Sequence, residues 1–209
     1  MTTRSAIIQP QISLIDSFTE ASGTVNLENH TPEYPKTGVW SSLGLTASVA
    51  QIVAANDVVT KSATASIFYN IDLGARPSQV ICSFKTISTS KSAAVVPVVI
   101  RSDALGNGLA VRISSLSANL IVGLYPIVEG VLGTVIAEQL GTGGNNLATA
   151  QDIIVTDTGT TVTVDATAAS AGCLITAQPT TLYASNTGVG IASYSSEIND
   201  TWDSIIAYA

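Results

Sequence analysis

Thr161-Val162-Thr163-Val164-Asp165 alternates polar and apolar residues, and it follows the apolar run Ile153-Ile154-Val155-Thr156 after a short break at Asp157-Thr158-Gly159-Thr160. Alternation with a period of two is typical of a β-strand that has one face on a core and the other in water. The break contains residues that tolerate a positive φ, which a hairpin turn requires. The stretch therefore predicts an antiparallel hairpin at the surface of a β-sandwich.

The same kind of segment recurs along the whole chain. Short runs rich in Val, Ile, Thr and Tyr are separated by Gly, Asn, Asp and Ser, and the turn residues at 105–108 and 129–130 predict two further hairpins. This spacing fits strands and not helices, so it predicts an all-β, two-sheet antiparallel sandwich. The expected strands are Gln11–Phe18, Gly38–Ser42, Ala47–Ala54, Ala65–Leu73, Val80–Ile87, Val95–Ser102, Leu109–Ser114, Leu120–Val128, Val131–Leu140, Asp152–Thr158, Thr160–Asp165, Thr180–Ser185, Val189–Ser193 and Ser204–Tyr208.

Composition narrows the classes of partner. The length of 209 residues suits a single domain. Of these residues 46% are hydrophobic and only 11% are charged. A net charge of −7, with eight scattered Lys and Arg residues, argues against binding the phosphates of nucleic acid. The longest apolar stretch, Ala93–Ile100, contains Pro97 and is too short for a membrane span. The first ten residues have too short an apolar run for a secretory leader and predict an arm.

Groups that carry catalysis are sparse in this sequence. His30, the only histidine, precedes Thr31-Pro32 and is expected to be structural, since no Gly-x-Ser-x-Gly phrase supplies a nucleophile. The glutamates lack the paired spacing of a glycosidase. The glycine-rich stretch 141–146 lacks the Lys-Ser/Thr ending of a phosphate loop. We therefore expect no enzyme activity, no catalytic residue and no cofactor.

Two short acidic segments are candidate calcium sites, because oxygen ligands on loops suit hard cations. They are Asp103 with Asn107, and Asn199-Asp200 with Asp203. Neither offers enough ligands, so no metal is expected and the first segment is interpreted as a turn. Cys82 and Cys173 lie in apolar contexts, which favours buried free thiols, with a disulfide as the alternative.

Aromatic residues are the remaining candidates for ligand contact. A sugar site needs exposed aromatic rings beside polar groups. Trp40 and Trp202 are expected in the core, whereas Tyr34 and Tyr194 lie in loop-like contexts and are the candidate glycan contacts.

Four groups of phrases, in order, resemble the concanavalin A-like lectin/glucanase jelly rolls (the LamG-like group), especially those of tailed-phage virion proteins and bacterial surface proteins. They are Leu14-Ile15-Asp16-Ser17-Phe18; Gly23-Thr24-Val25-Asn26-Leu27 with His30-Thr31-Pro32 and Trp40; Val98-Val99-Ile100-Arg101-Ser102-Asp103 with Asn107-Gly108-Leu109-Ala110-Val111-Arg112-Ile113; and Gly188-Val189-Gly190-Ile191 with Trp202-Asp203-Ser204-Ile205-Ile206-Ala207. The resemblance covers nearly everything from Leu14 to Ala209, although Trp202 stands where the family usually has Phe. It implies a jelly roll with its first and last strands side by side.

The resemblance also implies a function. We expect a phage virion structural protein, a capsid decoration or cement protein at the virion surface that is assembled in the host cytoplasm. It would bind capsid or tail proteins and copies of itself, as a trimer or dimer. The domain is expected at 14–209 and the arm at 1–13, where Ile7, Ile8 and Ile12 would contact another subunit. The alternative is a carbohydrate-binding, lectin-like module for surface glycans, which could belong to a tail.

Overall fold

The computed structural model describes residues 11–42, 50–53, 58–61, 66–86, 95–116, 119–194 and 200–209. Ile7, Ile8 and Asn199 therefore lie outside the described residues. Within the described part the fold is all-β, and its only helix is a single 3-10 turn, Leu27–Asn29. No helix there has the length and apolar character needed to cross a membrane.

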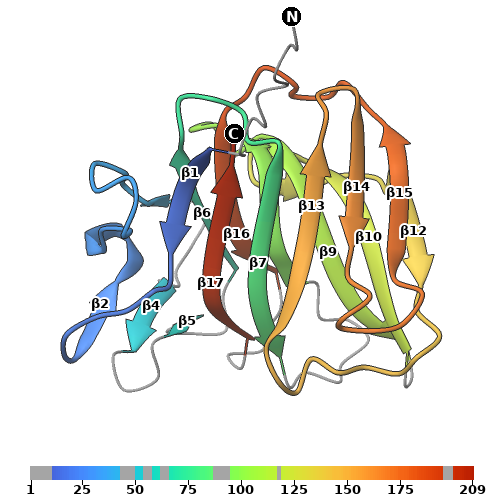
Figure 1. The fold of residues 1–209 in the computed structure, drawn as a ribbon, viewed down its shortest axis with the longest axis horizontal. Helices are drawn as coiled ribbons and strands as arrows, with labels where there is room; N and C mark the ends of the chain where they lie inside the picture. The colour runs from blue at the N-terminus through green and yellow to red at the C-terminus, as the bar shows by residue number, and fades with distance from the viewer. Residues whose placement is uncertain are drawn as a thin grey trace, which may run out of the picture.

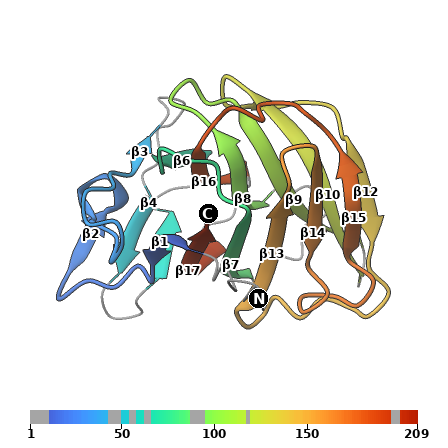
Figure 2. The same ribbon diagram turned by 45° about the horizontal axis from the view of Figure 1, so that its top comes forward.

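Two antiparallel sheets face each other (Figure 1). Sheet A runs, in spatial order, β15 (Leu174–Pro179), β14 (Thr161–Asp165), β13 (Gln151–Asp157), β7 (Gln79–Thr86), β17 (Asp200–Tyr208), β5 (Val58–Lys61), β4 (Ala50–Val53) and β2 (Thr24–Asn26), with β1 (Ile12–Asp16) also paired to β17. Sheet B runs β11 (Val131–Leu132), β10 (Asn119–Val128), β9 (Gly108–Leu116), β8 (Val95–Ser102), β16 (Gly188–Ser193), β6 (Ile67–Asp72) and β3 (Ser41–Ser42), with β12 (Ala137–Leu140) also on β10. Figure 2 shows both sheets curling around the space between them. This is the predicted jelly-roll sandwich.

The core lies between the sheets. On β7, Val80, Cys82 and Phe84 are buried at alternate positions, as the period of a strand requires. The predicted core residues Trp40 and Trp202 are both fully buried, and the Trp202 indole donates to the Pro97 carbonyl at 3.0 Å. Sheet B also carries a second cluster of buried apolar residues on its outer face, with Leu132 and Tyr194 packed against it; the cluster consists of Phe68, Val96, Val99, Ala110, Tyr125, Ile127 and Ala192.

The first and last strands lie side by side, as the resemblance implied. Leu14 pairs with Ala207 and Asp16 with Ile205, and the Ala209 amide donates to the Gln11 carbonyl at 2.7 Å. Ile12, which was predicted to contact another subunit, pairs with Tyr208 inside β1 and is 38% exposed. The first sheet strand therefore begins within the segment expected to be an arm.

One predicted strand was wrong and another was divided. Residues 180–185 form turns after β15, because the Arg101 guanidinium binds the carbonyls of Thr180 and Leu182 that a strand would give to its neighbour. The strand of this region, β15, was missed because most of its side chains are exposed at the sheet edge. The run 131–140 forms two short strands, both paired with β10, rather than one.

Candidate functional site

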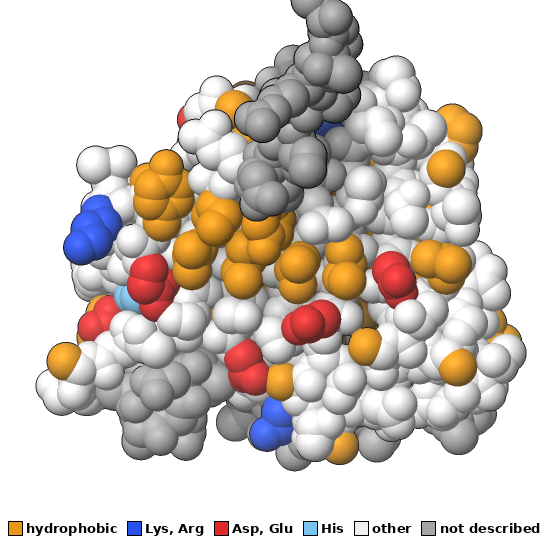
Figure 3. All heavy atoms as spheres, viewed as in Figure 1, with side chains coloured by type: hydrophobic (Ala, Val, Ile, Leu, Met, Phe, Trp, Pro, Cys, Tyr) orange, Lys and Arg blue, Asp and Glu red, His pale blue; other side chains and the backbone are white. Residues whose placement is uncertain are grey.

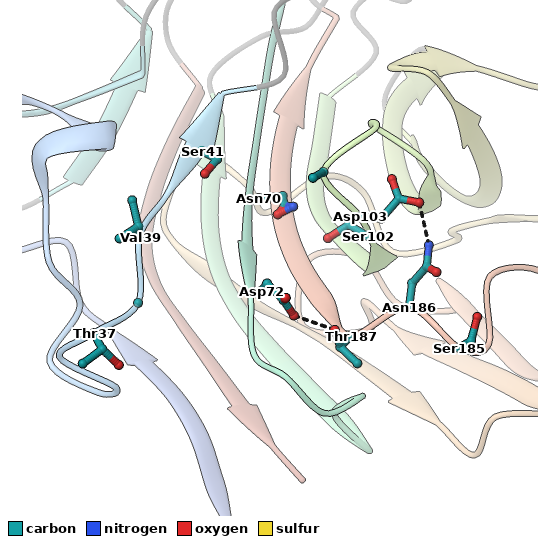
Figure 4. A pocket seen from close by; sticks show the side chains of 12 residues that line it. Thr37, Val39, Ser41, Asn70, Asp72, Ser102, Asp103, Ser185, Asn186 and Thr187 are labelled. Carbon is teal, nitrogen blue, oxygen red and sulfur yellow. Dashed lines mark hydrogen bonds between the residues drawn. The ribbon is translucent and has the colours of Figure 1, made fainter.

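A pocket of about 420 Å³ opens at one end of sheet B, where β6 and β8 finish and β16 begins (Figure 4). Its volume falls within the usual range for small-molecule sites. Almost every lining side chain is polar. The lining residues are Thr37, Gly38, Val39, Ser41, Asn70, Asp72, Ser102, Asp103, Ala104, Ser185, Asn186 and Thr187.

Strand alternation explains why polar side chains gather here. In β6, Ile71 points into the core, whereas its neighbours Asn70 and Asp72 face the pocket. Ser41 of β3 is the cross-strand partner of Asn70, and it lines the same wall. An apolar strand thus carries two adjacent polar positions on its outer face.

A glycine permits the close approach of strands at this point. Gly188 pairs with Asp72 on one side and with Ser102 on the other. A Cβ atom on Gly188 would lie 2.6 Å from both the carbonyl oxygen and the hydroxyl of Ser102. Only glycine therefore fits between β6 and β8 beneath the pocket.

Asp72 and Asp103 are the two carboxylates of the pocket. Asp72 accepts hydrogen bonds from the Thr187 hydroxyl at 2.5 Å and the Gly74 amide at 2.9 Å, and these bonds hold its pKa below the usual value. Burial alone would raise the pKa of Asp103, but hydrogen bonds from Asn107, Leu105 and Asn186 outweigh burial and lower it. Both groups are therefore ionised at neutral pH.

The turn predicted at Asp103 is present. Oδ1 of Asp103 accepts from the amides of Leu105 and Asn107, at 2.9 and 3.0 Å. Its Oδ2 accepts from the Asn186 side-chain amide at 3.0 Å, which joins two walls of the pocket (Figure 4). The carboxylate thus organises two loops, while its place in the lining leaves it beside the cavity.

Ser102 has the least satisfied polar group in the pocket. The residue is only 1% exposed, and its Oγ has no hydrogen-bond partner. Leaving a buried hydroxyl unpaired costs on the order of 1–3 kcal/mol, and buried polar groups in native proteins are nearly always paired. An unpaired hydroxyl in a cavity lining is therefore a place where a bound molecule would supply the missing partner.

A buried ion pair fixes the backbone beside Ser102. Arg101 has a φ of 51°, and its guanidinium donates to both carboxylate oxygens of Asp157 on β13, at 2.7 and 2.8 Å. Another nitrogen of the same group donates to the carbonyls of Thr180 and Leu182, in the segment that leads to Asn186. Arg101 thus positions both the 102–104 and the 185–187 walls of the pocket.

The lining defines what the pocket can bind. It contains two carboxylates, amides and hydroxyls, and no lysine, arginine or histidine is among the lining residues. Such a site accepts hydrogen bonds from hydroxyl groups and repels phosphates and carboxylates. Both lining carboxyls have lowered pKa values, so neither is suited to donate a proton for cleavage of a glycosidic bond.

The predicted glycan contacts lie elsewhere. Tyr34 bridges to Ile15 at the β1 edge of sheet A and is 46% exposed. Tyr194 follows β16 and packs on the outer cluster of sheet B; its hydroxyl donates to the Gly130 carbonyl at 2.8 Å, and burial raises its pKa to about 12. Neither tyrosine lines the pocket, so the structure does not bring the two together there.

The other polar candidates, His30 and Asp200, have structural contacts. His30 is buried, with Nε2 2.8 Å from Asp16 and Nδ1 2.7 Å from Glu20, while the Trp40 indole donates to Asp16 at 2.7 Å. Asp200 accepts from the hydroxyls of Thr86 and Ser193. Across the described ranges, no group of three or more His, Cys, Asp or Glu side chains is arranged to hold a metal ion.

Sequence reasoning missed Asp72 and Ser102. The available signal was the phrase Asn70-Ile71-Asp72, in which polar residues alternate with a core residue at the end of an otherwise apolar strand. The partner elements β3 and β16 are far away in sequence, so the phrase alone did not show that a pocket would form there.

Comparisons with known proteins bear on the fold. No family model matches the sequence, and no curated protein matches it either. The apo structure of Crh5 transglycosylase aligns with a TM-score of 0.53 and 9% identity, covering 92% of this chain and 86% of that chain. A carbohydrate-binding module, CBM66 from Bacillus subtilis, aligns with a TM-score of 0.49 and 12% identity, covering 81% and 91% respectively. At this identity the first of these likenesses concerns the jelly-roll fold and not the activity.

Proposed function

We propose that this domain binds carbohydrate, and that the pocket at the end of sheet B receives the hydroxyl groups of a neutral sugar. The observation that carries the proposal is the buried, unpaired hydroxyl of Ser102 beside two ionised carboxylates, Asp72 and Asp103. A sugar hydroxyl both donates and accepts, so it can donate to a carboxylate while it accepts from Ser102.

The chemistry of the pocket favours a neutral sugar over an acidic one. Asp72 and Asp103 give the cavity a negative charge, and no lining cation offsets it. A uronic acid, a sialic acid or a sugar phosphate would be repelled. Hydrogen bonds from hydroxyls to ionised acceptors are stronger than those between neutral groups, so a neutral polyol is the ligand that gains most.

Binding without cleavage is the proposed activity. Glycosidic hydrolysis needs one carboxyl group that is protonated at the working pH. Hydrogen bonds lower the pKa values of both lining carboxyls, which removes the proton donor. Incubation with a bound oligosaccharide should leave it intact by mass spectrometry, and a shortened or transferred product would refute this part of the proposal.

The test begins with a screen of neutral and acidic glycans on an array, followed by calorimetric titration of each one that binds. Ser102→Ala should weaken binding about tenfold, the effect of losing one hydrogen bond of roughly 1.4 kcal/mol. Asp72→Asn should also weaken it. Ser13→Ala is the matched control, because Ser13 likewise has a buried hydroxyl without a partner but does not line the pocket.

The proposal fails if no neutral glycan binds, or if Ser102→Ala binds as tightly as the unchanged chain. The Ser102→Ala variant should remain folded, since the hydroxyl it removes makes no hydrogen bond. A thermal melt of both serine variants checks this directly and separates lost binding from lost structure.

The virion role stays a prediction, together with capsid or tail proteins as partners and the virion surface as location. Two of its three arm residues, Ile7 and Ile8, lie outside the described residues, and Ile12 belongs to β1. Co-sedimentation of the purified chain with assembled particles would test it, and it is compatible with a sugar pocket on the same domain.

A further inference from the structure

Four isoleucines form a straight row across the outer face of sheet A. Ile15 pairs directly with Ile206, Ile206 with Ile81, and Ile81 with Ile154, on the neighbouring strands β1, β17, β7 and β13. Directly paired residues point to the same face of a sheet. The adjacent positions Ile205, Cys82 and Ile153 are buried in the core, so the isoleucine row faces outward. Figure 3 shows hydrophobic side chains in a band across this face.

This row departs from what a solvated sheet face requires. The outward positions of the next strand, β14, are Thr161, Thr163 and Asp165, which is the ordinary pattern for a face in water. The continuous row of partly exposed isoleucines does not follow this solvated pattern. Contiguous exposed apolar patches mark interaction sites on proteins, so the row is a candidate interface.

The residues that flank the four isoleucines are complementary to each other. At the β1 end, Ile15 bridges to the exposed Tyr34, and at the β13 end Ile154 pairs with Asp165. The paired positions therefore run tyrosine, four isoleucines and aspartate, and the exposed Leu174 of β15 follows as the direct partner of Asp165. A two-fold axis through its midpoint, between Ile206 and Ile81, superposes isoleucine on isoleucine and places a phenol opposite a carboxylate at each end.

We propose that the outer face of sheet A binds a second copy of this chain about that two-fold axis. Ile15 would pack on Ile154 of the partner subunit, and Ile206 on Ile81 of the partner subunit. The Tyr34 hydroxyl would donate to Asp165 of the partner subunit, whose Oδ1 in the single chain already accepts from Thr167. Such a contact is isologous, and it closes as a dimer because each half uses the same surface.

The side chains of the row favour a second copy over other occupants. The chain carries a net charge of −7, and Asp165 and Asp152 lie in and beside the row, so an anionic membrane surface is disfavoured. Isoleucines provide neither hydrogen-bonding groups nor flat rings, so the row does not suit a glycan. Two sheet faces, in contrast, pack well at about 10 Å through interdigitated aliphatic side chains.

The proposed dimer leaves the pocket open, because the pocket belongs to sheet B. The dimer would carry two sugar sites, and both sites could bind at once to a surface that displays many glycans. The dimer and the sugar site are independent inferences, since no pocket-lining residue belongs to the isoleucine row.

The test measures mass in solution by light scattering and sedimentation at about 100 µM chain, a concentration at which a dimer with a Kd of about 1 µM is almost fully formed. The unchanged chain should be a dimer, and Ile81→Lys should be a monomer. Thr163→Lys is the matched control, because it adds the same charge to the same face outside the row and should stay dimeric.

Ile154→Thr is a second, milder variant for the case that Ile81→Lys does not fold. It keeps a β-branched residue on β13 but removes apolar contact, so it should weaken the dimer at least several-fold. Circular dichroism and glycan binding should be unchanged in all three variants. A monomeric unchanged chain overturns the proposal, whatever else covers the row. A folded Ile81→Lys variant that remains dimeric also overturns it.

Discussion

Arg101 of β8 and Asp157 of β13 join the two sheets through a two-pronged ion pair, with nitrogen–oxygen distances of 2.7 and 2.8 Å. Both side chains are almost completely buried, and Arg76 adds a third contact at 3.0 Å from Asp157. Burial would raise the pKa of Asp157, but the hydrogen bonds and charge of Arg101, with the Gly159 amide, lower it. Arg101 precedes Ser102 in β8, so the position of the ion pair fixes the backbone of a pocket-lining residue.

Arg101→Met should destabilise the fold by about 3–5 kcal/mol, because it leaves the buried Asp157 carboxylate with the Gly159 amide and with Arg76 as its one remaining cation among the described residues. Chemical denaturation measures this loss. Adding Asp157→Leu to the same chain should recover part of it, since replacing both partners removes the stranded charge. A loss below about 1 kcal/mol for the single variant, the size of a surface pair, would contradict this account.

His30 should make stability depend on pH above about 6.5. Burial would lower its pKa, but hydrogen bonds and charge from Asp16 and Glu20 outweigh burial and raise it above 6.5. The protonated ring is therefore favoured in the folded state. Its stabilising contribution is complete below the unfolded value of 6.5 and is lost as pH rises through the higher folded pKa.

We expect the free energy of unfolding to fall as pH rises from about 6.5 through that folded value. Because the chain has one histidine, NMR titration of its ring reports the folded pKa without overlap. His30→Gln should be less stable at pH 6 and should flatten this part of the profile. A profile that stays equally steep in the variant would assign the dependence to another group.

Gly188→Ala should damage both stability and the pocket. The added methyl would meet the Ser102 carbonyl and hydroxyl at 2.6 Å, and backbone atoms cannot retreat as a flexible side chain can. Overpacking of this kind costs about 1–3 kcal/mol. A lowered melting temperature together with weaker sugar binding is expected. Unchanged values for both would show that β16 and β8 separate more easily than their register suggests.

Cys82 and Cys173 should resist thiol reagents while the protein is folded. Both cysteines are buried and form no disulfide. Burial raises the pKa of each thiol, so little reactive thiolate is present. A colorimetric thiol assay should detect almost no reaction in the native state and both cysteines in denaturant. Failure to detect either one in denaturant without a reductant would reveal a disulfide and overturn the free-thiol interpretation.

Alternation in the sequence was enough to predict most strands of the sandwich. Residues 161–165 form the expected strand paired with β13, and the eight residues Val95–Ser102 form β8 with the predicted bounds. The pattern failed at 180–185, where a segment rich in Thr, Leu and Tyr has no strand partner because Arg101 binds its carbonyls. It also failed at β15, an edge strand whose side chains are mostly exposed, so its sequence does not alternate between apolar and polar residues.

The sequence by itself determined the all-β class, the two buried tryptophans and the adjacency of the chain ends, because these follow from local period and from family phrases. Only the tertiary structure decided where function is possible. Asp72, Ser102 and Asn186 are far apart in the chain, and the isoleucines of sheet A come from four separate strands. A period of two fixes which face a residue occupies, but strand order and register decide which residues become neighbours on that face.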